Sequence, residues 1–479
     1  MLSREDNELI TDTNPGTPMG DLFRRFWLPV ALTEELPAAD CPPVRVTVLG
    51  EKLLGFRDSN GKLGLLDLYC PHRGASLFFA RNEECGLRCV YHGWKFDVNG
   101  DCLDLPSAPE GETYRQKIHI KSYPVHEAGG LIWAYLGPAH TQPPFPDFEW
   151  TRVPATHRYV TKFELECNYL QAMEGDFDPA HARFLHSAIE GGGIRRQRND
   201  GPGSTIGISS YASSDPAERY PRVVGDRRVN AEFPMTPDKI FIEDHGAATM
   251  NIQVTELSNG RFRAMANPTW WMPVFCPPGL VAPGHFSGNF RVPIDNTHLT
   301  FFRLRWSLDP ISPEDMEEYR HGGYTHPELV PGTWRTKANV HNDYELDRLA
   351  QRWFSYTGIK TFPLQDIAMM ENQWGPLADR TQEHLTSMDA YIIHLRRRLL
   401  GAAKALAQGV EPPEAQAADS FHIHRAMAEG DTREEAVARA RSKALTNLLG
   451  PDGSRIGEPP PPRVSLTDQQ AELAAMQPV

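Results

Sequence analysis

Two short stretches of the sequence each combine one cysteine with one histidine. Cys70 stands two residues before His72 and Cys89 three residues before His92, with 16 residues between the two stretches. Thiolate sulfur and imidazole nitrogen are common ligands of zinc and iron. A zinc finger normally pairs cysteine with cysteine and histidine with histidine, whereas here each stretch offers one of each. This arrangement favours a two-iron cluster with both cysteines on one iron and both histidines on the other; a structural zinc site is the alternative.

A second group of candidate ligands, Asp178, His181 and His186, lies in the stretch NYLQAMEGDFDPAHARFLHS. We expect a helix over residues 168–188. Asp178 and His181 are three residues apart and share a helix face. His181 and His186 are five residues apart, about 140° around an ideal helix, so both reach one ion only if a distortion such as a π-bulge intervenes. Two histidines and a carboxylate can hold Fe(II), but Asp178 is also placed to cap the start of a helix.

The elements around these groups divide the chain into two parts. From about residue 23 to residue 137, short apolar runs alternate with turn residues, which predicts a small all-β domain with hairpins. Residues 138–147 carry four prolines and are expected to form a linker. Beyond residue 158 strand-like and helical patterns mix. Strands are expected over 240–242, 249–254, 262–266, 286–292 and 299–306, helices over 383–408 and 432–449, and long loops over 191–203 and 307–333.

The composition argues against several classes of protein. The 479 residues carry 49 Lys and Arg against 62 Asp and Glu, a formal net charge of −13. No basic tract compensates for this charge, which argues against nucleic acid or an anionic membrane as a partner. No stretch approaches the roughly 18 apolar residues of a membrane span, and the N-terminus lacks the apolar region of a signal peptide. Seven cysteines are too few for a disulfide scaffold, so we expect a reducing, cytoplasmic location in which Cys85 is a free thiol rather than a ligand.

The stretches CPHRGASLFF and CVYHGWKFDVNGDC resemble the Rieske iron–sulfur domain of ring-hydroxylating oxygenases. Respiratory Rieske domains carry a disulfide between their two ligand loops, and this sequence has no cysteine pair for one. The resemblance implies an α+β protein, with an N-terminal all-β Rieske [2Fe-2S] domain over residues 20–140. A catalytic domain with a helix-grip (Bet v1/START-like) antiparallel sheet would follow over 150–410, and residues 411–479 would form a helical and proline-rich C-terminal extension.

The resemblance extends to the mononuclear iron site of the phthalate dioxygenase-like branch of that family. The segment TFPLQDIAMMENQWGPLADRTQEHLTSMDAYIIHLRRRLL is similar to the part of the branch that supplies the third iron ligand. The implied ligands are His181, His186 and Asp366, with Glu371 as a supporting or structural carboxylate. The implied role of Asp178 is a bridge for electron transfer, which bonds to His181 and reaches His92 of the partner subunit.

This resemblance implies the oxygenase component of a Rieske system that uses O2 and electrons from a separate protein. The sequence holds no glycine-rich dinucleotide fingerprint and no further four-cysteine run, so the implied partner is a flavin and iron–sulfur NAD(P)H reductase. The implied assembly is a homotrimer or a stacked homohexamer. Ring hydroxylation of an aromatic, carboxylated substrate is the expected reaction. The alternatives are O-demethylation or diphenyl-ether cleavage by the same type of enzyme, and a non-catalytic Rieske electron carrier or zinc-stabilised scaffold.

A carboxylated substrate calls for a guanidinium group in an otherwise apolar pocket. The stretch GGGIRRQRND offers Arg195, Arg196 and Arg198 as candidates for substrate binding, and a solvated basic loop is the alternative. Aromatic residues beyond these ligands are candidates for the apolar walls of the pocket, or else ordinary core residues; they are Phe184, Trp270, Trp271 and Phe275.

Overall fold

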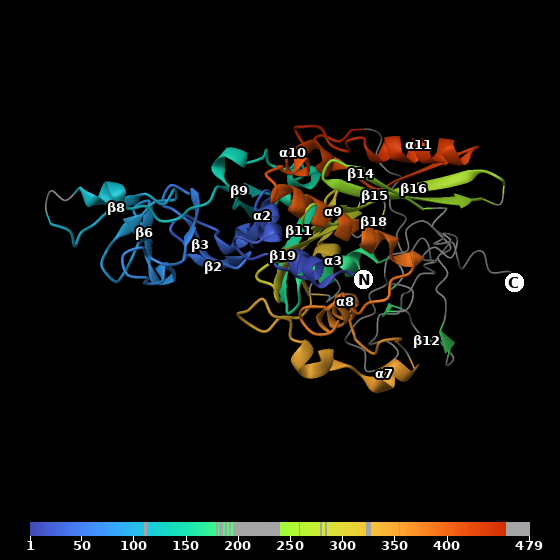
Figure 1. The fold of residues 1–479 in the computed structure, drawn as a ribbon, viewed down its shortest axis with the longest axis horizontal. Helices are drawn as coiled ribbons and strands as arrows, with labels where there is room; N and C mark the ends of the chain where they lie inside the picture. Colours follow the sequence, from blue (N-terminus) through green and yellow to red (C-terminus); the bar gives the residue numbers. More distant parts are fainter. Residues whose placement is uncertain are drawn as a thin grey trace.

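The computed structural model describes residues 1–109, 113–178, 181, 185–186, 189–190, 193–194, 240–257, 259–277, 280–282, 285–321, 327–353 and 355–456. Figure 1 shows an elongated molecule. The small sheets from the first third of the chain form one end, and a large antiparallel sheet with its helices forms the other. None of the helices in the described ranges combines the length and the apolar character needed to span a bilayer.

The first third of the chain forms two small antiparallel sheets around a core of their own. Leu54, Phe56, Leu66 and Phe96 are fully buried in this core, because alternate residues of a strand face the same side. One sheet has the order β2-β3-β4 and the other the order β5-β6-β7-β8. Their strands are β2 (Val44–Val48), β3 (Glu51–Arg57), β4 (Leu63–Asp67), β5 (Arg81–Glu83), β6 (Gly86–Arg88), β7 (Lys95–Phe96) and β8 (Cys102–Asp104).

A third small sheet joins this end to the rest of the molecule. Its strands β1 (Trp27–Leu32), β9 (Val125–Ala128) and β10 (Leu131–Tyr135) pair in the order β1-β10-β9. Its buried side chains belong to the large core that also holds the main sheet. The expected linker contributes to this core as well, since Phe145 packs edge-on against Trp27 and Trp133 with ring centroids 5.8 and 5.3 Å apart.

The main sheet has nine strands, and all of its pairings are antiparallel. Seven strands follow the order β11-β20-β19-β17-β16-β15-β14, while β18 pairs with β19 and β21 with β16. The α+β architecture is therefore confirmed. The strands are β11 (Arg158–Leu165), β14 (Ile240–His245), β15 (Ala248–Glu256), β16 (Phe262–Trp271), β17 (Phe275–Cys276), β18 (Leu280–Ala282), β19 (His285–Pro293), β20 (Leu299–Ser307) and β21 (Ala426–Gly430).

The helices pack on this sheet and on one another. Helix α3 lies against β17, β19 and helix α8, while α11 lies along β15, β16 and β21. Residues beyond 411 thus complete the main sheet through β21 and cover it through α11 (Figure 1). The helices are α1 (Arg4–Thr11), α2 (Pro18–Phe23), α3 (Tyr169–Phe177), α6 (Pro313–His321), α7 (Arg348–Trp353), α8 (Phe362–Glu371), α9 (Ala390–Leu406), α10 (Pro413–Gln416) and α11 (Arg433–Ala444). A short hairpin joins β12 (Ile189–Glu190) to β13 (Gly193–Ile194).

Three expectations about the elements are wrong. The helix expected over 168–188 ends at Phe177, where Asp178 is the C-terminal cap. The loop expected over 307–333 contains α6, whose start is capped by the Ser312 hydroxyl, which accepts the Asp315 N–H at 3.0 Å. The helix expected from residue 383 begins at Ala390 instead, and Glu383 forms an ion pair with Arg396 of that helix.

Candidate iron centres

The two cysteine–histidine stretches form loops with the same backbone geometry. One follows β4 and the other joins β6 to β7. The Cys70 and Cys89 N–H groups each donate to the carbonyl five residues on, at 2.9 and 2.8 Å. Each cysteine carbonyl accepts from a glycine four residues on, and these glycines, Gly74 and Gly93, have φ of +70° and +77°. Glycine adopts this left-handed conformation without steric cost.

The loops bring the predicted cluster ligands together in pairs. Cys70 and Cys89 are 2% and 3% exposed, and both are free thiols. The rings of His72 and His92 lie 4.5 Å apart between centroids, and His72 stacks on Trp94 at 4.3 Å. The Nδ1 atom of His72 is buried and forms no hydrogen bond within the described residues. A buried imidazole nitrogen without a partner fits a metal ligand, because buried polar atoms are otherwise satisfied.

Burial sets the protonation of the Cys70 thiol in the metal-free chain. Burial raises the pKa of Cys70 to about 11, and the neighbouring Cys89 thiol adds to the effect. Metals bind the thiolate rather than the thiol. Cys70 is therefore a neutral thiol in the metal-free chain, and it gives up its proton when a metal binds.

His181, His186 and Asp366 meet at a single point. The Nε2 atoms of the two histidines lie 3.5 and 3.1 Å from the same Oδ1 atom of Asp366, and the three candidate ligand atoms all lie within 4.8 Å of one another. The Nε2 atom of His186 is buried and forms no hydrogen bond within the described part of the chain. Two imidazoles and one carboxylate that converge in this way match the ligand set of a non-haem Fe(II) centre.

Different elements supply these three side chains. His181 lies beyond the end of α3, and the Leu185 N–H donates to its carbonyl at 2.8 Å. Asp366 lies in α8, whose start is capped by the Thr361 hydroxyl and stabilised by Pro363 in the first turn. The histidines are therefore not held on one continuous helix with α3.

Gln365 orients His186. The His186 Nδ1 atom lies 2.7 Å from Oε1 of Gln365, and the Gln365 Nε2 atom donates to the carbonyl of Ile359 at 2.8 Å. Because the amide nitrogen is used in this way, Oε1 must accept, so Nδ1 carries the hydrogen and Nε2 is left for a metal. Phe362 stacks on the same imidazole with ring centroids 3.6 Å apart.

Opposite charges balance within this group. Burial lowers the pKa of His181, but Asp178 and Asp366 outweigh it and raise the pKa to about 10. For Asp366 the effect of burial is the opposite, because burial raises the pKa of a carboxyl group. The two histidines outweigh it and hold the pKa of Asp366 well below its usual range. The metal-free site thus holds a proton on His181, which a cation replaces on binding.

Asp178 lies beside the group rather than in it. Its Oδ2 atom is 3.7 Å from the Nδ1 atom of His181, on the side of the ring away from Asp366, and its side chain is 30% exposed. Its own N–H donates to the carbonyl of Glu174 at 3.0 Å. Asp178 thus ends α3. Residues 179 and 180, where a helix capped by Asp178 would begin, lie outside the described residues.

Buried ion pairs fix α3 beneath the site. Glu174 accepts from Arg380 at 2.8 Å and from Arg396 of α9 at 2.6 Å. Asp176 pairs with Arg291 of β19 at 2.7 Å and accepts from Asn289 at 3.3 Å. Nothing local in the sequence marks these partners, because each contact joins segments more than a hundred residues apart.

The remaining candidates fall in four groups. Glu371 accepts the Glu166 N–H at 2.7 Å and the Tyr344 hydroxyl at 2.5 Å, so it serves packing and is not among the converging ligands. Trp270 is buried and donates to the Pro273 carbonyl at 3.2 Å. Trp271 and Phe275 line a cavity described below. The substrate-binding candidates Arg195, Arg196 and Arg198, with Phe184, lie outside the described residues.

Known proteins match the chain over most of its length. A family model for the Rieske [2Fe-2S] domain matches residues 26–124, and one described as LigXa C-terminal domain like matches residues 134–193 and 282–426. The phthalate 4,5-dioxygenase oxygenase subunit of Pseudomonas putida is 33% identical over 85% of this chain and 88% of its own. The 5,5'-dehydrodivanillate O-demethylase oxygenase subunit of a Sphingobium strain is 30% identical over 91% of each chain.

The fold has solved counterparts too. The structure of NdmA from Pseudomonas putida CBB5 with caffeine superposes on this chain with a TM-score of 0.55 and 17% sequence identity. The superposition covers 84% of this chain and 96% of the NdmA chain. The expected Rieske [2Fe-2S] cluster and mononuclear iron are the cofactors of this type of protein, and the loops and the converging triad above offer ligand sets that fit them. The chain belongs to the Rieske oxygenases and is an oxidoreductase related to the oxygenase subunits of phthalate dioxygenase-type systems.

Proposed function

We propose that this chain hydroxylates an aromatic ring that carries a carboxylate, with O2 as the oxidant and electrons from a separate NAD(P)H reductase. The observation that carries the proposal is the convergence of His181, His186 and Asp366 on one point. These three groups would hold an iron, which would supply the O2 activation needed beside the substrate. Gln365 keeps the His186 Nε2 atom aimed at that point, and α8 and the segment after α3 keep the three side chains together.

The face of the main sheet next to the site carries three buried arginines, one of which is paired with Asp176. Arg291 of β19 and Arg303 and Arg305 of β20 are 2%, 6% and 3% exposed. Residues opposite one another in paired strands share a face, and Asn289 lies opposite Arg303 while Ser287 lies opposite Arg305. The three guanidinium groups thus occupy the face that contacts Asp176. We keep Arg195, Arg196 and Arg198 as further candidates for the carboxylate contact.

For electron delivery we propose an oligomer, a homotrimer or a stacked homohexamer. In this scheme Asp178 links His181 of one subunit to His92 of the partner subunit. The position of Asp178 supports it, since one carboxylate oxygen faces the outer nitrogen of His181 while the side chain keeps access to solvent. A flavin and iron–sulfur reductase is the proposed electron donor.

O-demethylation is the second candidate reaction. The relative named as an O-demethylase is 30% identical over 91% of this chain, close to the identity of the dioxygenase relative. The two reactions differ in their products, because demethylation releases formaldehyde and dioxygenation gives a cis-diol.

The test is turnover of a panel of aromatic acids, including phthalate, benzoate and methoxybenzoates, by the chain with a Rieske-system reductase and NADH. Product should form with the unaltered chain, and Asp366→Ala and His186→Ala should abolish it while the Rieske absorption spectrum stays unchanged. Asp309→Ala, in an exposed carboxylate, is the matched control and should remain active. Turnover that persists in Asp366→Ala would overturn the assignment of the site, and formaldehyde in place of a diol or phenol would favour demethylation.

A further inference from the structure

A cavity lies where the C-terminal segment meets the main sheet. It is bordered by β16, β17, β19 and β20, by the turn at residues 148–150 and by residues 421–425, and it leaves about 60 Å³ for the centres of water molecules. One water needs about 10–15 Å³ in this measure and occupies about 30 Å³ of liquid. The cavity therefore has room for roughly four to six waters, which is the volume of a single aromatic ring with a small substituent.

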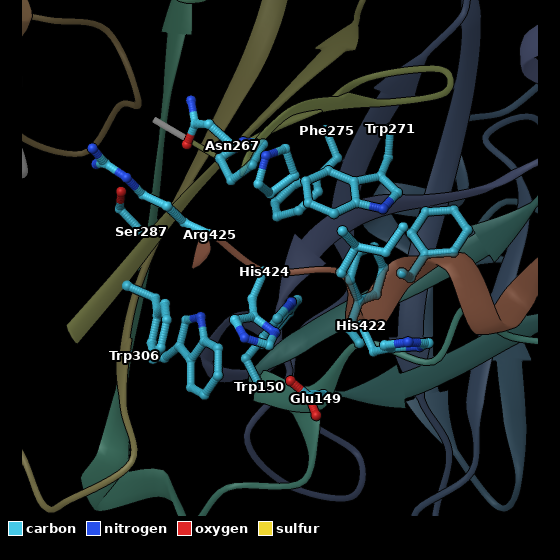
Figure 2. A pocket seen from close by; sticks show the side chains of 16 residues that line it. Glu149, Trp150, Asn267, Trp271, Phe275, Ser287, Trp306, His422, His424 and Arg425 are labelled. Atoms are coloured by element: carbon cyan, nitrogen blue, oxygen red, sulfur yellow. The ribbon is translucent and has the colours of Figure 1, made fainter. Parts of the chain in front are cut away.

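The walls of the cavity are mainly aromatic. Phe286 and Trp306 stack on each other with ring centroids 4.3 Å apart and planes 20° apart. Trp150, Trp271 and Phe275 complete the surface that surrounds the space (Figure 2). Flat aromatic walls favour a flat aromatic ligand through stacking and edge contacts.

One end of the cavity carries a cation. Figure 2 shows the guanidinium of Arg425 at the same end as Ser287 and Asn267, with His422 and Glu149 at the other. Its Nη2 and Nε atoms lie 2.6 and 3.1 Å from the sulfur of Met265, and a thioether is a weak acceptor.

No carboxylate of the described residues forms an ion pair with Arg425. Glu429, in the strand that follows, pairs with Arg261 and Arg263 instead. Arg425 is also largely removed from solvent, and this burial lowers its pKa. A guanidinium in such a position stays charged and is stabilised by an anion.

The cavity is distinct from the iron site. Along β19, Asn289 and Arg291 contact Asp176 beneath the iron ligands, and successive residues of a strand face opposite sides. Phe286, and Trp306 opposite it in β20, therefore lie on the other face of the sheet. Ser287 borders the cavity only at the Arg425 end.

We propose that this cavity is a second binding site, specific for an aromatic carboxylate. The ring occupies the space between the aromatic walls, and the carboxylate accepts hydrogen bonds from the guanidinium of Arg425. This site goes beyond the oxygenase function, because no step of turnover passes through it. Its occupant is recognised by ring and charge together.

Benzoate is the probe, and equilibrium dialysis of the holoenzyme with radiolabelled benzoate is the measurement. Arg425→Met should remove one binding site per chain or weaken it by about tenfold or more, the loss expected for a charged hydrogen bond. Arg425→Lys should retain most of the binding, and Arg439→Met, on the exposed surface of α11, should behave as the unaltered chain. The site should persist in His186→Ala, because it does not involve the iron ligands.

Benzamide has nearly the shape of benzoate but no charge, so it tests whether binding depends on the charge. It should bind the unaltered chain and Arg425→Met equally, whereas benzoate should discriminate between them. Equal benzoate binding by the unaltered chain and Arg425→Met, or loss of the site in His186→Ala, would overturn the proposal. Neither result depends on turnover, so the proposed oxygenase function stands or falls separately.

Discussion

At the scale of single residues, the proposed iron site depends on a side chain that is not a proposed ligand. Gln365 precedes Asp366 in the chain, yet its amide contacts His186, which lies 179 residues earlier. The ligand types and the histidine spacing could be predicted because they are local in the sequence. The hydrogen bond that fixes the His186 ring could not, because it joins residues 179 positions apart that only the tertiary structure brings together.

Gln365→Leu tests this positioning role. The leucine has a similar volume but cannot accept the Nδ1 hydrogen, so we expect the affinity for the mononuclear iron to fall by about 10–100-fold. The measurement is iron retained after dialysis against a chelator, with the Rieske spectrum as an internal reference. Gln382→Leu is the control, because the Gln382 amide donates to the surface residue Asp379. Unchanged iron retention in Gln365→Leu would contradict the role.

At the scale of elements, patterns confined to one loop or strand could be predicted more readily than boundaries set by packing. The strand expected over 299–306 agrees with β20 (Leu299–Ser307) to within one residue, because turn-forming residues bracket it. The end of α3 at Phe177 could not be predicted in the same way, since apolar residues continue at helical spacing beyond it. The last turn of α3 is also held by the ion pairs of Glu174 with Arg380 and of Asp176 with Arg291, which form only in the tertiary structure.

The two ligand loops share one geometry but differ in their surroundings, which gives a matched pair of variants. A Cβ atom on Gly93 would lie 2.6 Å from Cγ of Pro106, whereas one on Gly74 would meet nothing within 4 Å. Both alanines incur the cost of a positive φ, about 1–2 kcal/mol. We expect Gly93→Ala to lose most of its Rieske absorbance per chain and Gly74→Ala to keep most of it. Equal losses of absorbance in the two variants would show that the positive φ, and not the contact with Pro106, determines how much cluster is retained.

At the scale of the whole molecule, the two proposed metal centres belong to different parts of the fold. The Rieske ligands lie at one end of the elongated chain, and the triad lies beside the main sheet (Figure 1). The α+β class and the order of the two parts could be predicted from the pattern of apolar runs along the sequence and from the resemblance to Rieske oxygenases. The addition of β21 to the main sheet could not, because residues 426–430 meet β16 only through long-range pairing.

Mixed oligomers test whether electrons cross between subunits. His92→Ala removes one proposed cluster ligand and Asp366→Ala one proposed iron ligand, so each variant alone should be inactive. Co-expressed with different tags, they should regain part of the activity, since an intact cluster of one subunit then serves the intact iron of the next. The measurement is turnover by doubly tagged oligomers. Inactive mixtures that carry both tags would show that the electron stays within one subunit.

The separate core of the first third of the chain also bears on the order of events during synthesis. The four proposed Rieske ligands, and the core around them, lie within residues 54–120, whereas the proposed iron triad is incomplete until Asp366 has been made. Between His92 and Asp366 the ribosome needs roughly 14–55 seconds at about 5–20 residues per second. A nascent chain can therefore receive its iron–sulfur cluster well before the oxygen-activating site exists, so the electron carrier is assembled first and the reactive centre last.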